Sequence, residues 1–158
     1  MKRKGSLLLV LLVAALHAPR YGHAAEATIT SDELEIQNNG ERTIFRGHVV
    51  LVQTPYEVHS DQMVRVKETG VVNADGHVVG SWVSPKSEHV RIDGEQAVYD
   101  PATQTVQIWG KQQVAVELNG EKGHALFHGN RGWAFTQTPG KARLTGQVTG
   151  HVVPAAAS

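Results

Sequence analysis

The sequence predicts an all-β protein that is built from repeated strand–turn–strand units. Three observations predict this fold class: a glycine recurs in strand-like surroundings, apolar residues alternate with polar ones, and turn-forming residues separate the apolar runs. The recurring glycines are Gly47, Gly76, Gly110 and Gly146, at intervals of 29, 34 and 36 residues. A unit that recurs at such a spacing cannot bury its apolar face alone, so its copies are expected to stack on one another.

The alternation has a period of two, which is the period of a half-buried strand. Val64 and Val66 alternate with Arg65 and Lys67, and the segments around Phe45 and Ile108 show the same pattern. Outside the first residues, no stretch shows a convincing helical period. The predicted strands therefore have one wet face and one apolar face.

Residues that favour turns lie between these apolar runs. Asn38-Asn39-Gly40 and Asn119-Gly120 predict hairpin turns, because Asn and Gly tolerate a positive φ, and Asp100-Pro101 opens another turn. Each unit is expected to begin at a short polar start, pass through a strand and a turn, and end in the strand that carries the glycine. The starts are predicted at Ser31-Asp32, at Ser60-Asp61, at Asp93-Gly94-Glu95 and, more loosely, at Glu121.

The first 25 residues have the features of a secretory signal peptide. A basic head (Lys2, Arg3 and Lys4) precedes an apolar run over residues 7–16 and a small-residue stretch that ends near Ala25. A retained membrane anchor is the alternative, but the run is shorter than the roughly 20 residues that cross a bilayer. We therefore expect a cleaved segment at 1–25, one β domain at 26–154 and a short tail at 155–158.

Charge and cysteine content narrow the function classes. The chain has 15 basic and 15 acidic residues, and loss of the first 25 would leave 11 basic against 15 acidic residues. A mildly acidic chain is a poor match for nucleic acid, which binds basic surfaces. The sequence contains no cysteine, so an exported domain of this size must be stable without disulfides.

No motif for catalysis or for a cofactor is present. There is no Gly-x-Ser-x-Gly, no cysteine nucleophile and no phosphate-binding glycine loop. His124 and His128 are four residues apart, but this spacing gathers ligands on a helix, and the segment is predicted as strand and loop. We expect no enzyme, no metal site and no cofactor.

Four segments resemble the OstA-like (LptA) family of periplasmic lipopolysaccharide-transport proteins. They are Ile29 to Asp32, Thr43 to Gln53, Ser60-Asp61 and Gly94 to Asp100. The family pattern F-x-G-N-V is present as Phe45-Arg46-Gly47-His48-Val49, with His48 in place of the asparagine. The second unit departs from the pattern because no aromatic residue precedes Gly76, and the tail after Val153 is short.

The resemblance implies a fold, a function and a set of partners. The family fold is a β-jellyroll of two antiparallel sheets that face each other in an open V. Its members are Gram-negative periplasmic carriers that hold the lipid A acyl chains of lipopolysaccharide and stack head to tail. Their partners are an inner-membrane-anchored OstA-like protein of the LptC type and an outer-membrane barrel protein of the LptD type.

Strand parity then predicts which side chains point inward, where the resemblance puts the lipid groove. Most residues of such a set pack the core, and only a subset near one rim is expected to contact lipid. The predicted groove residues are Ile29, Ile36, Phe45, Val49, Leu51, Val64, Val66, Trp82, Tyr99, Val106, Ile108, Val114 and Val116.

Unprotected edge strands are the predicted sites of assembly, because an open edge is a template for strand pairing. The N-terminal edge is predicted from 27 to 36 and the C-terminal edge from 144 to 153, with Ala27, Ile29, Leu34, Ile36, Leu144, Val148 and Val152 as edge residues. Two alternatives remain open at this point. One is a structural β-repeat module that binds proteins at its edges without carrying lipid, and the other is a module for another amphiphile or a polysaccharide.

Overall fold

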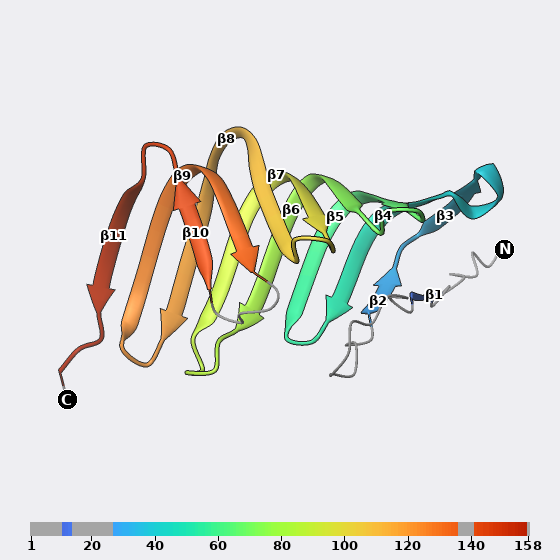
Figure 1. Ribbon diagram of the computed structural model, residues 1–158. Coiled ribbons are helices and arrows are strands. Elements are labelled where there is room, and N and C mark those ends of the chain that lie inside the picture. The colour runs from blue at the N-terminus through green and yellow to red at the C-terminus, as the bar shows by residue number, and fades with distance from the viewer. Residues whose placement is uncertain (1–10, 14–26, 136–140, 158) are drawn as a thin grey trace, which may run out of the picture.

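The computed structural model describes residues 11–13, 27–135 and 141–157, which form one open antiparallel sheet of eleven strands (Figure 1). A short 3-10 turn, η1 (Asn38–Gly40), joins the third strand to the fourth. The all-β prediction is confirmed, and so is the turn predicted at Asn38-Asn39-Gly40. The strands are β1 (Leu11–Val13), β2 (Ala27–Thr30), β3 (Glu33–Gln37), β4 (Arg42–Gln53), β5 (Tyr56–Val66), β6 (Val72–Val83), β7 (His89–Asp100), β8 (Thr105–Gly120), β9 (Gly123–Phe135), β10 (Ala142–Thr145) and β11 (Thr149–Pro154).

A register shift in the middle of each ladder between the long strands β4 to β9 divides the sheet into two walls. The strands bend over at these shifts, so the apolar faces of the two walls face each other in the open V that the resemblance implied (Figure 1). Wall 1 comprises β2, the segments 49–53, 56–59, 78–83, 89–94, 114–120 and 123–129, and β11. Wall 2 comprises β3, the segments 42–46, 62–66, 72–75, 96–100, 105–109 and 131–135, and β10.

The bend is lined by a repeated contact between a polar side chain and a glycine, which we call the apex row. Asp32 lies against Gly47, whose φ is +78°, and Asp61 lies against Gly76, whose φ is +81°. Glycine adopts this left-handed region without the steric cost that a Cβ atom brings. The row contains Asp32 with Gly47-His48, Asp61 with Gly76-His77, Glu95 with Gly110-Lys111, and Asn130 with Gly146-Gln147.

All four recurring glycines therefore lie at the bend, but the predicted start of the fourth unit was wrong. Asn130 takes the place in that unit that Asp32 takes in the first, because each donates its backbone N–H to the carbonyl of its glycine, at 2.9 and 3.0 Å. Glu121 instead lies in the turn between β8 and β9, at the far end of wall 1.

The register shifts at the bend act as β-bulges, and they decide which residues face inward. They change the alternation of inward and outward side chains in only half of the long strands. In β4 and β6 the inward residues on either side of the bend are four apart, as for Ala74 and Val78, so the parity is preserved. In β5 they are three apart, because Ser60 and Met63 both face the interior. Parity counted from the N-terminal half of β5 therefore fails in its C-terminal half.

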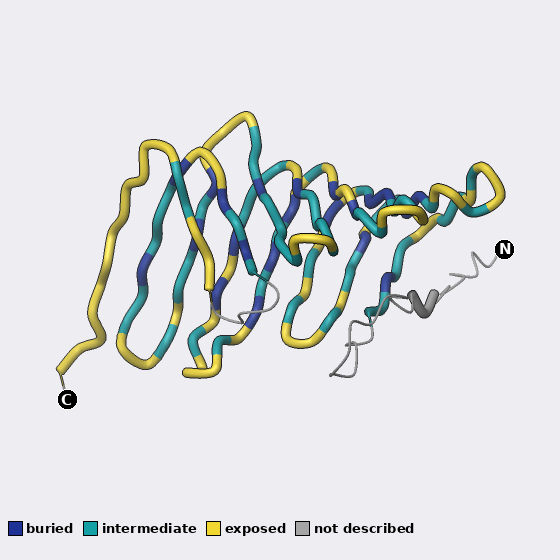
Figure 2. Tube along the Cα trace, viewed as in Figure 1, coloured by how far each residue is buried: buried dark blue, intermediate teal, exposed yellow. Residues whose placement is uncertain are grey.

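The core fills the angle of the V. Its most deeply buried members come from both walls and include Val49, Met63, Val78, Ile92 and Val114, each no more than 1% exposed. Figure 2 shows the buried segments concentrated along the middle strands, whereas β11 is exposed throughout. The strongest packing therefore lies inside the sheet, and the C-terminal outermost strand is the least protected.

Candidate functional site

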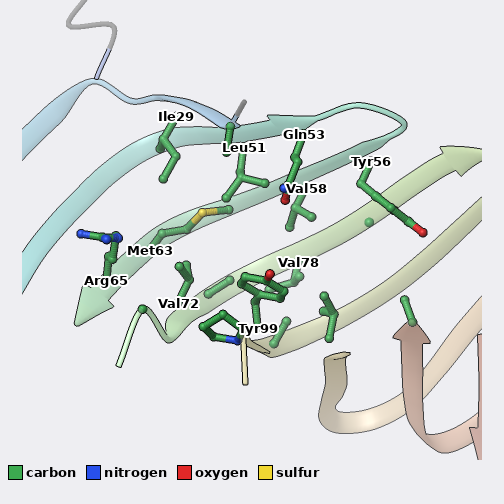
Figure 3. Close-up of a pocket in the computed structure, with 18 of the residues that line it drawn as sticks. Ile29, Leu51, Gln53, Tyr56, Val58, Met63, Arg65, Val72, Val78 and Tyr99 are labelled. Carbon is green, nitrogen blue, oxygen red and sulfur yellow. The ribbon is translucent and has the colours of Figure 1, made fainter. Parts of the chain in front are cut away.

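An open apolar groove of about 850 Å³ lies between the two walls. Figure 3 shows side chains from β2, β4, β5 and β6 converging on it. Its apolar lining comprises Ala27, Ile29, Leu51, Tyr56, Val58, Met63, Val72, Ala74, Val78, Gly80, Trp82, Ala97, Tyr99, Pro101, Ala102, Val106, Ile108 and Ala134. A groove of this composition binds its ligand by burying apolar area rather than by directed hydrogen bonds.

Small residues keep the groove open. Ala74 and Ala97 are register partners on β6 and β7, and Ile108 on β8 pairs with Ala97. Larger side chains at these two alanines would point into the open space from the wall. The width of the groove therefore depends on the small size of Ala74 and Ala97.

Tyr56 and Trp82 stand side by side in the lining. Their ring centroids are 5.7 Å apart, and the Tyr56 hydroxyl donates to the backbone carbonyl of Phe135 at 3.2 Å. Burial raises the pKa of Tyr56, so the phenol stays protonated and keeps its donor at neutral pH. Because Tyr56 belongs to wall 1 and Phe135 to wall 2, this bond ties the two walls together.

The C-terminal part of the V is filled instead of open. Val90, Ile92, Val114 and Val116 are at most 6% exposed, and none of them lines the groove. Phe127 and Leu144 pack against the same cluster. On wall 1 the groove therefore extends only from β2 to β6, with a packed core after it, whereas on wall 2 its lining continues to Ala134 on β9.

Polar side chains gather at the rims of the groove. Arg65, Lys67 and Glu68 come from the end of β5 and the turn after it, on wall 2. Gln53 and Glu57 lie on wall 1, where Glu57 bonds to His59. The lining is thus apolar in its interior and charged at its mouth, which suits an amphiphile with a polar head.

Comparison with known proteins identifies the family. The family described as LptA/(LptD N-terminal domain) LPS transport protein matches residues 28–140, which is more than two thirds of the chain. The chain belongs to this family. Its members are transport proteins and not enzymes, as the absence of catalytic motifs predicted.

A solved structure shows the same LptA-like fold. It is the crystal structure of LptH, the LptA homologous periplasmic component of the conserved lipopolysaccharide transport device from Pseudomonas aeruginosa. The match has a TM-score of 0.65 at 15% sequence identity, and it covers 81% of this chain and 95% of that chain. A search of curated protein sequences gives no significant match.

The structure brings about half of the predicted groove residues together in the groove of this LptA-family chain. Ile29, Leu51, Trp82, Tyr99, Val106 and Ile108 line it. The other buried members, Phe45, Val49, Val114 and Val116, lie in the core and do not reach the open space. Whether the lining residues touch lipid stays a prediction.

Three predicted groove residues lie elsewhere. Val64 and Val66 are on the outer side of wall 2, because the bulge in β5 turns Met63 and Arg65 inward in their place. Val64 is buried there beside its register partner Ile44, outside the core cluster. Ile36 lies on β3 at the sheet edge and is 61% exposed.

Parity reasoning also missed part of the lining. Val72, Ala74, Val78 and Gly80 lie at even positions of β6, with the same parity as the predicted residue Trp82, a signal that the sequence contained. Met63 had no such signal, because the bend in β5 reverses the alternation, whereas Ala97 has the parity of the predicted residue Tyr99. The missed residues are therefore of two kinds, those that were readable and those that were hidden by a bulge.

The predicted edge residues lie at both ends of the sheet. Leu34 and Ile36 are on β3, Leu144 is on β10 and Val152 is on β11. Val148 lies between β10 and β11 and is half exposed. Ala27 and Ile29 are on β2, whose outer edge pairs with β1.

Two histidines of the apex row are held by carboxylates. His48 Nδ1 lies 2.7 Å from Asp32 Oδ2, and His77 Nδ1 lies 2.8 Å from Asp61 Oδ2. The hydrogen bond to Asp61, together with its charge, raises the pKa of His77, and Asp32 acts in the same way on His48. Both rings are more than 90% exposed, so they are paired surface groups.

We expect the His77 ring to titrate above the ordinary histidine range in an NMR pH titration. The folded-state pKa is raised, so the stabilising contribution is present below the unfolded pKa and is lost as pH rises through the folded value. Asp61→Asn should return the His77 midpoint toward the ordinary value while His48 keeps most of its shift. A midpoint that does not respond to Asp61→Asn would contradict the pairing.

The described segments contain neither a metal-binding cluster nor a membrane-spanning helix. Among residues 11–13, 27–135 and 141–157, no group of three or more His, Asp or Glu side chains is placed to hold a metal ion. No helix within this part of the chain is long and apolar enough to cross a membrane. The predicted signal cleavage site near Ala25 lies outside the described residues.

Proposed function

We propose that the chain is a non-enzymatic periplasmic carrier that holds the lipid A acyl chains of lipopolysaccharide in the groove and passes the molecule from the inner to the outer membrane. The observation that carries this proposal is the open apolar groove between the walls. Each methylene buried there contributes about 0.8 kcal/mol, so a few acyl chains supply ample affinity. An open groove also allows release, which an enclosed cavity would hinder.

A structural module that binds only proteins is the second candidate function. Such a module has no use for an open apolar interior and gains stability by filling it, because interiors pack to high density. The small residues Ala74 and Ala97 in the lining favour the carrier. The strands at the two ends of the sheet are compatible with both functions.

The ends of the sheet support head-to-tail assembly and pairing with LptC-type and LptD-type partners. Each end carries two short strands, β2 and β3 at one end and β10 and β11 at the other, with one strand of each pair on each wall. Glu33 and Glu35 face outward on β3, and Arg143 faces outward on β10. Continuation of wall 2 from copy to copy would bring these opposite charges together.

The proposed removal of residues 1–25 bears on the same edge. β1 lies within these residues and pairs with β2 through Leu11 and Ile29. Cleavage would remove β1 and leave the outer edge of β2 unpaired. Export and maturation would therefore yield the chain that is competent to assemble.

Site-specific photocrosslinking in cells tests the carrier function. We expect a probe at Val58, which lines the groove, to form a lipopolysaccharide adduct, and a probe at the next residue, His59, to form none. Val106 and Gln107 on β8 offer a second pair of the same kind. Absence of adducts at both groove positions, in protein that is expressed and folded, would leave the protein-binding module as the better account.

A further inference from the structure

An arginine in the apolar wall of the groove has no side-chain partner among the residues that the structure describes. Arg65 follows Met63 on the inward face of β5 and is paired in register with Thr43 and Val72 (Figure 3). Its side chain is only partly exposed, and it forms no hydrogen bond or ion pair with any residue that the structure describes. The same inward face continues to Lys67 at the start of the turn.

A partly buried cation without a counter-charge is unfavourable, because water no longer solvates it fully and nothing replaces that water. The acidic side chains of the lining do not supply the missing charge. Glu57 is on the opposite wall and bonds to His59, and Glu68 is exposed on the turn and forms no ion pair within the described part of the chain. Arg65 therefore retains its capacity to bind an anion that enters the groove.

The position of Arg65 defines where such an anion would lie. Arg65 lies beside Met63 and Val72 of the apolar interior (Figure 3). Lys67, two residues further along the chain, belongs to the charged rim. An anion bound there has apolar surface on one side and solvent on the other. This is the environment of the head group of an amphiphile whose chains lie in the groove.

We propose that Arg65, assisted by Lys67, is a phosphate-binding subsite that orients the bound lipid with its phosphorylated head at the β5–β6 rim. This inference rests on the proposed carrier function. A guanidinium presents paired donors that match phosphate oxygens, whereas an ammonium supplies a single mobile charge. The groove thus distinguishes a phosphorylated amphiphile from a neutral one that has the same acyl chains.

Competition binding with a fluorescent acyl probe tests the subsite on the purified mature chain. The two competitors are bisphosphorylated lipid A and the same lipid A after removal of both phosphates. Arg65→Gln should weaken binding of the phosphorylated lipid by about tenfold or more, as expected for loss of a charged hydrogen bond. Arg65→Gln should bind the dephosphorylated lipid as the unchanged protein does. The affinity of Arg65→Lys for the phosphorylated lipid should lie between those of the unchanged protein and Arg65→Gln.

The matched control is Arg91→Gln, because Arg91 is exposed on wall 1, pairs with Asp93 and does not line the groove. This variant should bind both lipids as the unchanged protein does. Equal weakening of both lipids by Arg65→Gln, in protein with an unchanged melting temperature, would overturn the subsite and leave Arg65 as a packing residue.

Competition with inorganic phosphate distinguishes a lipid head group from free phosphate as the anion at this subsite. Addition of millimolar phosphate should leave most of the lipid bound, because the acyl chains hold the head group in place. Full displacement by phosphate would overturn the assignment to a lipid head group. If the unchanged protein binds neither lipid, the carrier function itself fails, an outcome that differs from loss of phosphate discrimination alone.

Discussion

Ala97→Phe is expected to weaken lipid binding by at least about tenfold while the sheet remains folded. Ala97 lies in the lining between Ala74 and Ile108, and a phenyl ring there would enter space that the lipid needs. Exclusion of two methylenes costs about 1.6 kcal/mol, which corresponds to roughly tenfold in the dissociation constant. Titration with a fluorescent acyl probe measures this loss.

The control is Val98→Phe, which places the same ring on the opposite face of the same strand. Val98 pairs with Asn73 and Gln107 on the outside of wall 2. This variant should retain the binding of the unchanged protein. Equal affinities for the two phenylalanine variants, both with native circular dichroism, would show that the groove is not where the lipid binds.

Gly76→Ala should destabilise the fold by about 2 kcal/mol, because a left-handed backbone conformation alone costs an L-residue roughly 1–2 kcal/mol. The added Cβ would also overlap Asp61, whose Cβ and Cγ atoms would both lie 2.9 Å away. A domain of this size should then melt roughly 8 °C lower. Thermal unfolding followed by circular dichroism measures the change.

Two variants separate the causes. Gly80→Ala lies on the same strand, where the backbone is not left-handed and the new Cβ would meet only Ile108 at 3.9 Å, so its melting temperature should barely change. Measured against Asp61→Gly alone, which removes both the Cβ and the Cγ atom, Gly76→Ala should lose the part of its effect that comes from overlap. If Gly76→Ala melts like Gly80→Ala, the bend does not depend on glycine.

The repeat was readable from the sequence because the apex row requires glycine for a steric reason. Gly47 and Gly76 have a positive φ and contact an acidic side chain, so the recurrence of glycine in the sequence marks the position of the bend. Turn residues such as Asn38 and Asn39 were equally informative, since both adopt a positive φ. The strands and their order along the chain followed from these signals.

The groove was less readable, because a bulge leaves little trace in the strand that changes parity. In β5 the sequence shows Val64 and Val66 alternating with Arg65 and Lys67, and apolarity alone selects the valines as inward. The register shift between His59 and Gln62 reverses that choice. Arg65 was thus assigned to the wet face from sequence, although it lines the groove.

The boundary between groove and core was also hidden. Phe45 and Val49 face inward as parity requires, yet both are covered by other side chains. Whether an inward residue is covered depends on the sizes of residues far away in sequence, such as the alanines of β6 and β7. Local alternation contains no information on that.

The bond from Tyr56 to Phe135 joins two walls whose interior is open at the β2 end and filled further along wall 1. A molecule that enters over the β2 end meets open space first, and then a filled segment behind two walls that are tied together. Travel along a stacked row of such chains would require each copy to loosen its far half before handing its cargo onward. Each subunit would then hold one lipid at a time and release it only after this rearrangement. Lipid would therefore move along the row in discrete steps.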